Sequence, residues 1–218
     1  MTQLPFEDTP AKIDISDETL IYKGFRRFES YRLTLHTPDV PPVVQMREIL
    51  RVGGAVGIIA IDPAQQAIVL LRQFRLTAHF ATGRGELVEI PAGLVEPGED
   101  PALTAHRECI EETGLDPHEV HPLFSCLVSP GAVDEMAHFY LAFVDATHMP
   151  QQTGAEGESE IIRPFLVPLD EAVAALDGDA HLVNGYLRLA LMWVALHRAE
   201  VTARGRAWQA KWAPVSAK

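Results

Sequence analysis

Apolar residues alternate with polar ones, or run together, in short segments that turn residues separate along most of the chain. From Glu18 to Val52, three such segments are typical of strands: LIYKGFRRF, YRLTLHT and VVQMREILRV. In the second segment, Tyr31 and Leu33 alternate with polar neighbours, which is the period of a half-buried strand. Three strands are marginal as an independent unit, so we expect this small antiparallel N-terminal sheet to pack against another surface.

The pattern after this point predicts a larger sheet with helices. Gly53-Gly54 marks a boundary, and the turn signal Asp62-Pro63 separates the first two strands that follow. The predicted strands are AVGIIAID, AIVLLRQF, ELVEIPAG, VHPLFSCLV, EMAHFYLAFVDA and IIRPFLVP, and the predicted C-terminal helices are LDEAVAAL and VNGYLRLALMWVALHRA. We therefore divide the chain into N-terminal arm and strands (residues 1–52), a main domain (53–200) and a C-terminal tail (201–218).

Both ends of the chain are polar. Residues 1 to about 18 contain two prolines and predict an arm without a core of its own. Residues 201–218 predict a polar tail with exposed tryptophans. With 218 residues and 47% hydrophobic content, the chain is long enough for one ordinary domain and an appendage.

A helix with a crowded acidic face is predicted between Gly93 and Leu115. Asp100 can cap the helix, proline is tolerated at its first position, and Gly114 can end it. Glu108, Glu111 and Glu112 then fall within an arc of about 100°, where their carboxylates repel one another. The opposite face (Ala102, Leu103, His106, Cys109 and Ile110) is expected to pack on the sheet. A cation should lie among the carboxylates, either Arg107 or a hard divalent ion such as Mg²⁺.

The spacing G-x5-E-x7-R-E-x-x-E-E-x-G, which begins at Gly93, resembles the signature of the Nudix hydrolases. Cys109 stands where the usual pattern has an aliphatic residue, a mild departure because cysteine is a small buried hydrophobe. The alternative is a solvated acidic helix face, which the flanking cap, glycines and arginine disfavour. The resemblance implies an α/β/α sandwich around a mixed sheet, and hydrolysis of nucleoside diphosphates linked to another group with Mg²⁺ or Mn²⁺.

Features outside the signature are similar to those of the ADP-ribose pyrophosphatase branch of this family. Pro130 follows Leu115 by fifteen positions, where that branch has a marker proline. The segments SPGAVDE, LLRQFR and ELVEIPAGLVEPGE also resemble the branch. The N-terminal strands match the appendage through which its members form homodimers by exchanging strands, so the resemblance implies a homodimer.

The resemblance implies a metal site on the predicted helix. By this match Glu108 and Glu112 are metal ligands, together with the carbonyl of Ala92. Glu111 is a further ligand or a support for the other two. Arg107 is implied to orient the glutamates.

The long polar loop from Thr147 to Ser159 and the ESEIIR segment resemble the part of the branch that supplies another acidic ligand and the catalytic base. The match implies that Glu160 is the ligand and Glu158 the base that activates water. Glu156 lies close enough in the sequence to exchange roles with either residue. A flexible acidic loop without catalytic groups is the alternative.

Three residues elsewhere match substrate-binding positions of the branch. Arg75 is implied to bind substrate, and Glu135 to contact the nucleoside end. Arg47 is implied to reach the site of the other subunit. Without the resemblance, Arg75 would be interpreted as a solvated residue at a strand end, and Glu135 as the start of a strand.

Composition and charge limit the function classes. The net charge of −12 disfavours sequence-independent binding of nucleic acid, because such binding needs clustered Lys and Arg. Cys109 and Cys126 are the only cysteines, and they suggest neither a disulfide framework nor a zinc site. The start MTQLPFEDTP lacks the pattern of a secretory signal, and the apolar run Leu189–Leu196 is too short for a membrane span. We expect a cytoplasmic protein that binds neither nucleic acid nor membrane.

The sequence thus favours Mg²⁺-dependent hydrolysis of ADP-ribose or a related nucleoside diphosphate sugar. Alternatives within the family are a GDP-sugar, NADH, a flavin or a damaged nucleotide as substrate, because selectivity for base and sugar rests on a few loop contacts. A ligand-sensing domain without catalysis ranks last, because such domains usually have a broken signature and an attached DNA-binding module.

Overall fold

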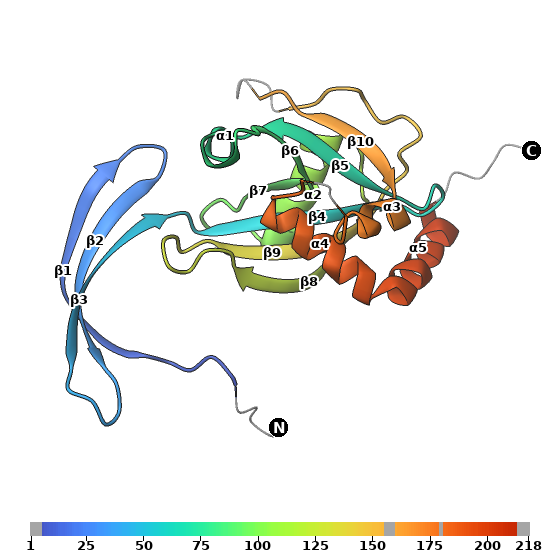
Figure 1. Ribbon diagram of the computed structural model, residues 1–218. Coiled ribbons are helices and arrows are strands. Elements are labelled where there is room, and N and C mark those ends of the chain that lie inside the picture. The colour runs from blue at the N-terminus through green and yellow to red at the C-terminus, as the bar shows by residue number, and fades with distance from the viewer. Residues whose placement is uncertain (1–5, 155–159, 179–180, 213–218) are drawn as a thin grey trace, which may run out of the picture. The chain divides into compact units, whose positions relative to one another are not determined.

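The computed structural model describes residues 6–154, 160–178 and 181–212 of the chain. Contacts divide the chain into two compact units, Met1–Gly53 with Ser129–Glu135, and Gly54–Val128 with Met136–Lys218. Figure 1 labels the elements of both units. No helix in the described ranges is long and apolar enough to cross a membrane.

The first unit contains an antiparallel sheet in the order β1-β2-β3. Its strands are β1 (Lys12–Lys23), β2 (Arg27–His36) and β3 (Val43–Arg51). β1 is exposed along its whole length, with Ile13 and Ile15 paired to Leu35 and Leu33 of β2. The predicted N-terminal sheet is therefore present, and several of its apolar side chains face solvent in one copy of the chain.

Two details of this unit differ from the sequence prediction. The first strand begins at Lys12, inside the segment predicted to be an arm, because the backbone of β1 pairs with β2 as far as His36. The segment LIYKGFRRF is not one strand, since β1 ends at Lys23 and β2 begins at Arg27 with a turn between them. Gly24 in this turn lies so close to the Tyr22 ring that a Cβ atom would meet it at 2.5 Å.

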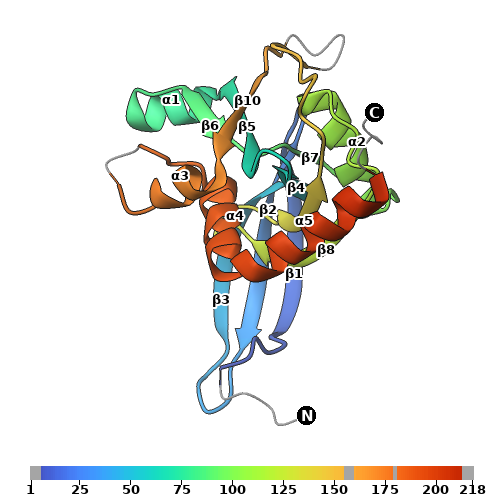
Figure 2. The ribbon, with the colours of Figure 1, turned by 90° about the vertical axis from the view of Figure 1, so that its right-hand side faces the viewer.

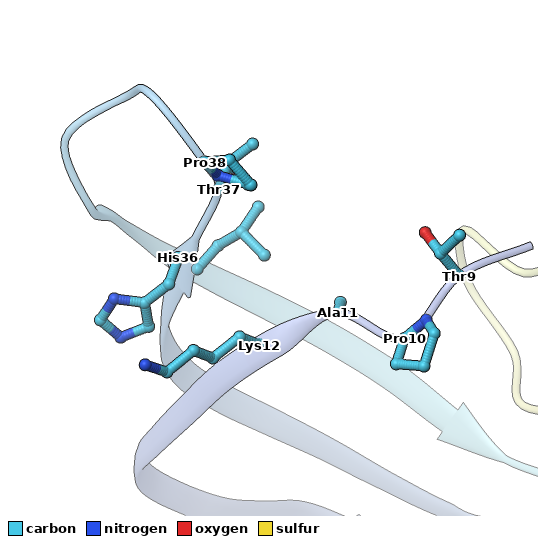
Figure 3. A pocket seen from close by; sticks show the side chains of 8 residues that line it. Thr9, Pro10, Ala11, Lys12, His36, Thr37 and Pro38 are labelled. Carbon is cyan, nitrogen blue, oxygen red and sulfur yellow. The ribbon is translucent and has the colours of Figure 1, made fainter.

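A hollow of about 560 Å³ lies at one end of this small sheet. Figure 3 shows the side chains that line it. Its lining residues come from the segment before β1, from β1 itself and from the end of β2 and the turn that follows it: Thr9, Pro10, Ala11, Lys12, Leu35, His36, Thr37 and Pro38. Nε2 of His36 lies 2.6 Å from a carboxylate oxygen of Asp14 on the neighbouring strand. The hollow lacks the grouped carboxylates that the sequence predicts for a catalytic site.

The second unit is built on a seven-stranded mixed sheet with the main order β10-β5-β4-β9-β8. Its central pair, β4 and β9, is parallel, and the other pairs are antiparallel. The strands are β4 (Gly54–Asp62), β5 (Ala67–Phe74), β6 (Glu86–Glu89), β7 (Ala92–Leu94), β8 (Val120–Leu127), β9 (Met136–Phe143) and β10 (Arg163–Pro168). The predicted strand ELVEIPAG is thus two short strands, because β6 pairs with β5 whereas β7 pairs with β4.

Helices pack on both faces of this sheet. On one face, Val56, Ile58 and Ala60 of β4 join Ala105 and Cys109 of α2 (Pro101–Thr113) in a buried cluster. The other face packs against α3 (Leu169–Ala174), α4 (Gly185–Leu196) and α5 (Arg198–Trp212), and α4 and α5 lie together in Figure 2. Side chains alternate along β4, so one strand supplies both cores. The predicted α/β/α sandwich is confirmed.

Two helices of this unit were not predicted. Residues 198–212 form α5 and not a polar tail, because Val201, Gly205 and Trp208 lie on one helix face and are buried. A Cβ atom at Gly205 would lie 2.9 Å from Pro63, so glycine permits this close packing. The other helix, α1 (Leu76–Thr82), has no buried residue and ends at Gly83, whose φ of 71° suits glycine.

The turn after β4 depends on one buried carboxylate, that of Asp62. Its Oδ1 accepts hydrogen bonds from the backbone of Ala64 (2.8 Å) and Gln65 (3.0 Å). Its Oδ2 accepts from the Gln65 side chain (2.9 Å) and from the backbone of Ala146 (3.0 Å). Asp62 thereby joins the β4–β5 turn to the segment after β9.

We expect Asp62→Ala to destabilise the protein by about 3 kcal/mol, because the buried N–H of Ala146 and the turn N–H groups of Ala64 and Gln65 would lose their acceptor. Urea unfolding followed by circular dichroism measures this loss. Asp145→Ala is the matched control, since Asp145 is exposed and accepts hydrogen bonds from the neighbouring Thr147. Its cost should stay below about 1 kcal/mol. Equal midpoints for the two variants would contradict the role given to Asp62.

Candidate active site

The acidic helix of the signature forms as the sequence predicts. The Asp100 side chain accepts a hydrogen bond from the Ala102 N–H (2.9 Å), Pro101 occupies the first turn, and Gly114 ends the helix with φ of 72°. The buried face differs from the prediction, because Leu103 is 65% exposed and Glu112 only 7%. The helix is therefore rotated so that one of the three glutamates faces the protein interior.

Glu108 lies against the backbone at the start of the signature. A Cβ atom at Gly93 would come within 2.0 Å of the Glu108 carboxyl carbon, so any larger residue at this position would displace the Glu108 side chain. Nη1 of Arg107 donates to Glu108 (2.8 Å) and to Glu111 (3.1 Å). The predicted contact between Arg107 and the glutamates is thus present, and Glu108 of the helix lies beside Gly93, the first residue of the signature.

Glu112 is a buried carboxylate held by the strand before the helix. Its Oε2 accepts a hydrogen bond from the Ala92 N–H at 2.7 Å. Burial raises the pKa of Glu112 to about 8, an effect that the Ala92 N–H opposes and the nearby Glu108 charge increases. The protein therefore does not fully offset the negative charge of an ionised Glu112, as expected of a carboxylate beside a cation site.

The residues at this point fit a hard divalent cation. Glu108 and Glu112 offer carboxylate oxygens beside the Ala92–Gly93 backbone, and oxygen donors of this kind are those that Mg²⁺ and Mn²⁺ prefer. Within the described ranges, His, Cys, Asp and Glu side chains do not gather in groups of three or more suited to a metal. The assignment of Glu108, Glu111, Glu112, Glu160 and the Ala92 carbonyl as ligands therefore stays a prediction.

Arg75 lies in the same neighbourhood, directly after β5. Burial acts to lower its pKa, but hydrogen bonds to Glu89 and the charges of Glu89, Glu112 and Glu160 outweigh this and raise the pKa above its ordinary value. Arg75 thus lies within electrostatic reach of the signature helix and of the one described loop glutamate. Its side chain remains 38% exposed, so a ligand can reach it.

Glu89 and Asn184 were not predicted as site residues, yet both belong to one hydrogen-bonded group with Arg75. Glu89 is buried, and it accepts hydrogen bonds from Arg75 and from the Asn184 side chain. Asn184 precedes α4 and caps it. A capping signal at Asn184 could have been read from the sequence, but its contact with Glu89 spans 95 residues and has no local signature.

The predicted base loop is tied to the signature helix at its root. The Thr153 hydroxyl donates to the backbone carbonyl of Glu112 at 2.5 Å, and Thr153 pairs with Ile162 through two backbone hydrogen bonds. Glu160, two residues before Ile162, is exposed. Glu156 and Glu158 lie outside the described residues, so their predicted roles stay predictions.

Two further predicted residues belong to the first unit. Arg47 is an exposed residue of β3 whose Nη1 donates to the carbonyl of Met46 at 2.9 Å. Glu135 is half-buried and follows Asp134, which accepts hydrogen bonds from Arg51 and from the backbone of Val52. Their roles toward substrate stay predictions.

The mixed sheet, the capped acidic helix and the glycine beside Glu108 are the features that place this chain among known proteins. A NUDIX domain model matches residues 52–189. The chain is 34% identical over 185 residues to an ADP-ribose pyrophosphatase of Escherichia coli (strain K12). The alignment covers 84% of this chain and 87% of the relative. The chain belongs to the Nudix family.

Other relatives are named for a different activity. The chain is 34% identical over 182 residues to a GDP-mannose pyrophosphatase of Citrobacter koseri, covering 79% of this chain and 90% of that one. It is 28% identical over 188 residues to a GDP-mannose pyrophosphatase of Yersinia pestis, covering 85% and 93%. Both groups of relatives are similar to this chain over most of its length.

Proposed function

We propose that this Nudix hydrolase cleaves the pyrophosphate bond of ADP-ribose, or of a closely related nucleoside diphosphate sugar, with Mg²⁺ as cofactor. The products would be a nucleoside monophosphate and a sugar phosphate, AMP and ribose 5-phosphate in the case of ADP-ribose. One observation carries the proposal: Glu108 and the buried Glu112 are held against Ala92–Gly93, with Arg75 in electrostatic reach. The similarity to ADP-ribose pyrophosphatases over 84% of the chain supports this choice of substrate.

The main requirement of this reaction is to offset the negative charge of the pyrophosphate, and residues of this chain are suited to do so. A pyrophosphate repels an attacking water through its own oxygens, so its charge must be offset where the water approaches. Arg75 would bind a phosphate oxygen through its exposed side, and Arg107 would keep Glu108 and Glu111 oriented. Mg²⁺, when bound by Glu108 and Glu112, would offset phosphate charge and lower the pKa of a water molecule. Glu158 would accept the proton of the attacking water.

A hydrolysis screen tests the substrate. ADP-ribose, GDP-mannose, NADH, FAD and 8-oxo-dGTP would be incubated with the protein and Mg²⁺, and the nucleotide products separated by chromatography. We expect ADP-ribose to have the highest kcat/KM and to yield AMP. A preference for NADH, FAD or the damaged triphosphate would contradict the proposal.

GDP-mannose is the second candidate, because two of the similar relatives are GDP-mannose pyrophosphatases. Glu108, Glu112 and Arg75 would act on its pyrophosphate in the same way, since their proposed roles involve neither the base nor the sugar. If GDP-mannose has the highest kcat/KM in the screen, the reaction class stands and the choice of ADP-ribose is wrong.

We also propose that the protein is a homodimer formed through its first unit. Ile13, Ile15 and Val43 form an apolar area on one face of the small sheet, and these three side chains are 45%, 56% and 50% exposed. Burial of such a surface against a second copy is favourable at about 25 cal/mol per Å². Cys109 and Cys126 are free thiols, which fits a reducing cytoplasm.

Light scattering at micromolar concentration should report the mass of a dimer. The double variant Ile13→Asp/Ile15→Asp should shift the mass toward that of a monomer, because each substitution would place a charge in the apolar interface. Val44→Asp is the matched control, since Val44 is 56% exposed and points to the opposite side of the sheet. A parent protein with the mass of a monomer would contradict the proposed homodimer.

A further inference from the structure

Glu89 is a buried carboxylate outside the Nudix signature, and three groups hold it. It lies at the end of β6 and is 4% exposed. Arg75 donates to it from Nη2 (2.8 Å) and from Nε (3.1 Å to one oxygen and 3.2 Å to the other). The Asn184 side chain donates from Nδ2 at 3.0 Å. A buried carboxylate is tolerated only when it is paired in this way.

The cap of α4 fixes the orientation of the Asn184 amide. Its Oδ1 accepts a hydrogen bond from the backbone N–H of Leu187 at 2.9 Å, as expected of an N-cap residue. The amide has one oxygen and one nitrogen, so using the oxygen for the cap directs the nitrogen toward Glu89. The start of α4 thus holds Glu89 in place, 95 residues away in the sequence.

Glu89 in turn restricts the Arg75 guanidinium. Two of its nitrogens, Nε and Nη2, bond to the same carboxylate, which fixes the plane of the group as well as its position. Among the described residues, Nη1 has no hydrogen-bond partner, so this nitrogen is available to a ligand. An arginine fixed before a ligand arrives loses less conformational entropy on binding than one that is mobile.

We propose that Glu89 and Asn184 are positioning residues, which hold the Arg75 guanidinium in the orientation that binds a phosphate of the substrate. The proposal rests on the proposed function, because it requires a pyrophosphate substrate that Arg75 contacts. Neither residue touches the substrate itself. A plain structural role, in which the three residues only join β6, α4 and the end of β5, is the competing explanation.

Glu89→Gln removes the charge and keeps the shape, and it tests the proposal directly. We expect KM for ADP-ribose to rise about 10-fold with kcat changed less than about 3-fold, because a weakened ground-state contact raises KM. Calorimetric titration with ADP-ribose in EDTA should show a similar rise in Kd without any turnover. Glu86→Gln is the matched control on the same strand, since Glu86 is exposed and pairs with Arg163, and its KM should match that of the parent.

A double-mutant cycle separates positioning from a structural role. If Glu89 acts through Arg75, then adding Glu89→Gln to Arg75→Ala should leave kcat/KM unchanged relative to Arg75→Ala alone. A structural role predicts a further loss in the double variant, and that result would overturn the inference. An unchanged KM for Glu89→Gln in a folded protein would overturn it as well.

Asn184→Ser covers the case in which the Glu89 variants do not fold. Serine retains the N-cap of α4 but removes the amide that donates to Glu89, so folding should be preserved. We expect a smaller rise in KM, about 3-fold, that also disappears in the Arg75→Ala background. A KM equal to that of the parent would contradict the role of Asn184. A parent protein that neither binds nor hydrolyses any nucleotide sugar would overturn the proposed function and this inference together, whereas an active parent with additive variants would overturn the inference alone.

Discussion

Glu112→Gln should reduce hydrolysis of ADP-ribose by orders of magnitude while leaving the fold intact. The Gln side chain has the same shape, and its oxygen can still accept the hydrogen bond that the Ala92 N–H donates at 2.7 Å. Only the charge is lost, and with it the attraction for a divalent cation. We expect the loss in kcat to be accompanied by a marked loss of Mg²⁺ affinity in calorimetric titration.

Two further measurements accompany this variant: the activity of a variant at a distant acidic residue, and the stability of the metal-free protein toward urea. Glu171→Gln removes an exposed carboxylate of α3 in the same unit and should leave both activity and Mg²⁺ affinity unchanged. Burial and the nearby Glu108 charge disfavour the ionised form of Glu112, and Gln has no ionised form, so the metal-free variant should unfold at no lower urea concentration than the metal-free parent. Full activity of Glu112→Gln would refute the proposed hydrolysis.

The signature helix was predictable because its signals are local. Asp100, Pro101 and Gly114 determine where the helix begins and ends, and the structure has the cap and the left-handed glycine at those positions. The direction in which the helix faces was not predictable in the same way. Burial of Glu112 depends on the Ala92 N–H of a strand that pairs with β4, and sequence spacing carries no information on such pairing.

Errors at the two ends of the chain have a similar cause. β1 has charged residues between its apolar ones, and its pairing with β2 outweighs the weak strand pattern from Lys12 to Glu18. In α5, Val201, Gly205 and Trp208 are spaced for one helix face, but the surrounding polar residues conceal this pattern. In both cases tertiary contacts decide the structure where local preference is weak.

The site residues divide along the same line. Arg75 followed from a resemblance in its local segment, and the structure brings it near Glu112 and Glu160. Glu89 and Asn184 could not be selected, because their significance lies in bonds to residues 14 and 95 positions away. The local sequence ELVE places Glu89 next to two apolar residues, but this pattern does not reveal that the Glu89 side chain is buried or what it pairs with.

The second large effect is expected in the acidic loop, where Glu158→Gln should lower kcat by roughly 10²–10⁴-fold and leave Mg²⁺ affinity nearly intact. A general base acts on the attacking water, so its loss slows proton transfer without removing a metal ligand. Glu160→Gln should instead lower both kcat and Mg²⁺ affinity, because Glu160 is the proposed ligand of the loop.

Glu156→Gln completes this series as the variant expected to retain most of the parent's activity. The roles in the loop can be separated because Thr153 and Ile162 fix its root through backbone hydrogen bonds, and the Thr153 hydroxyl joins this root to the Glu112 carbonyl. A change of one carboxylate to an amide therefore leaves the loop anchored, and differences in kcat and metal affinity report on the altered side chain. If Glu158→Gln retains full turnover while Glu156→Gln abolishes it, the base is Glu156. The reaction class would survive that result, since it depends on Glu108 and Glu112 of the signature helix.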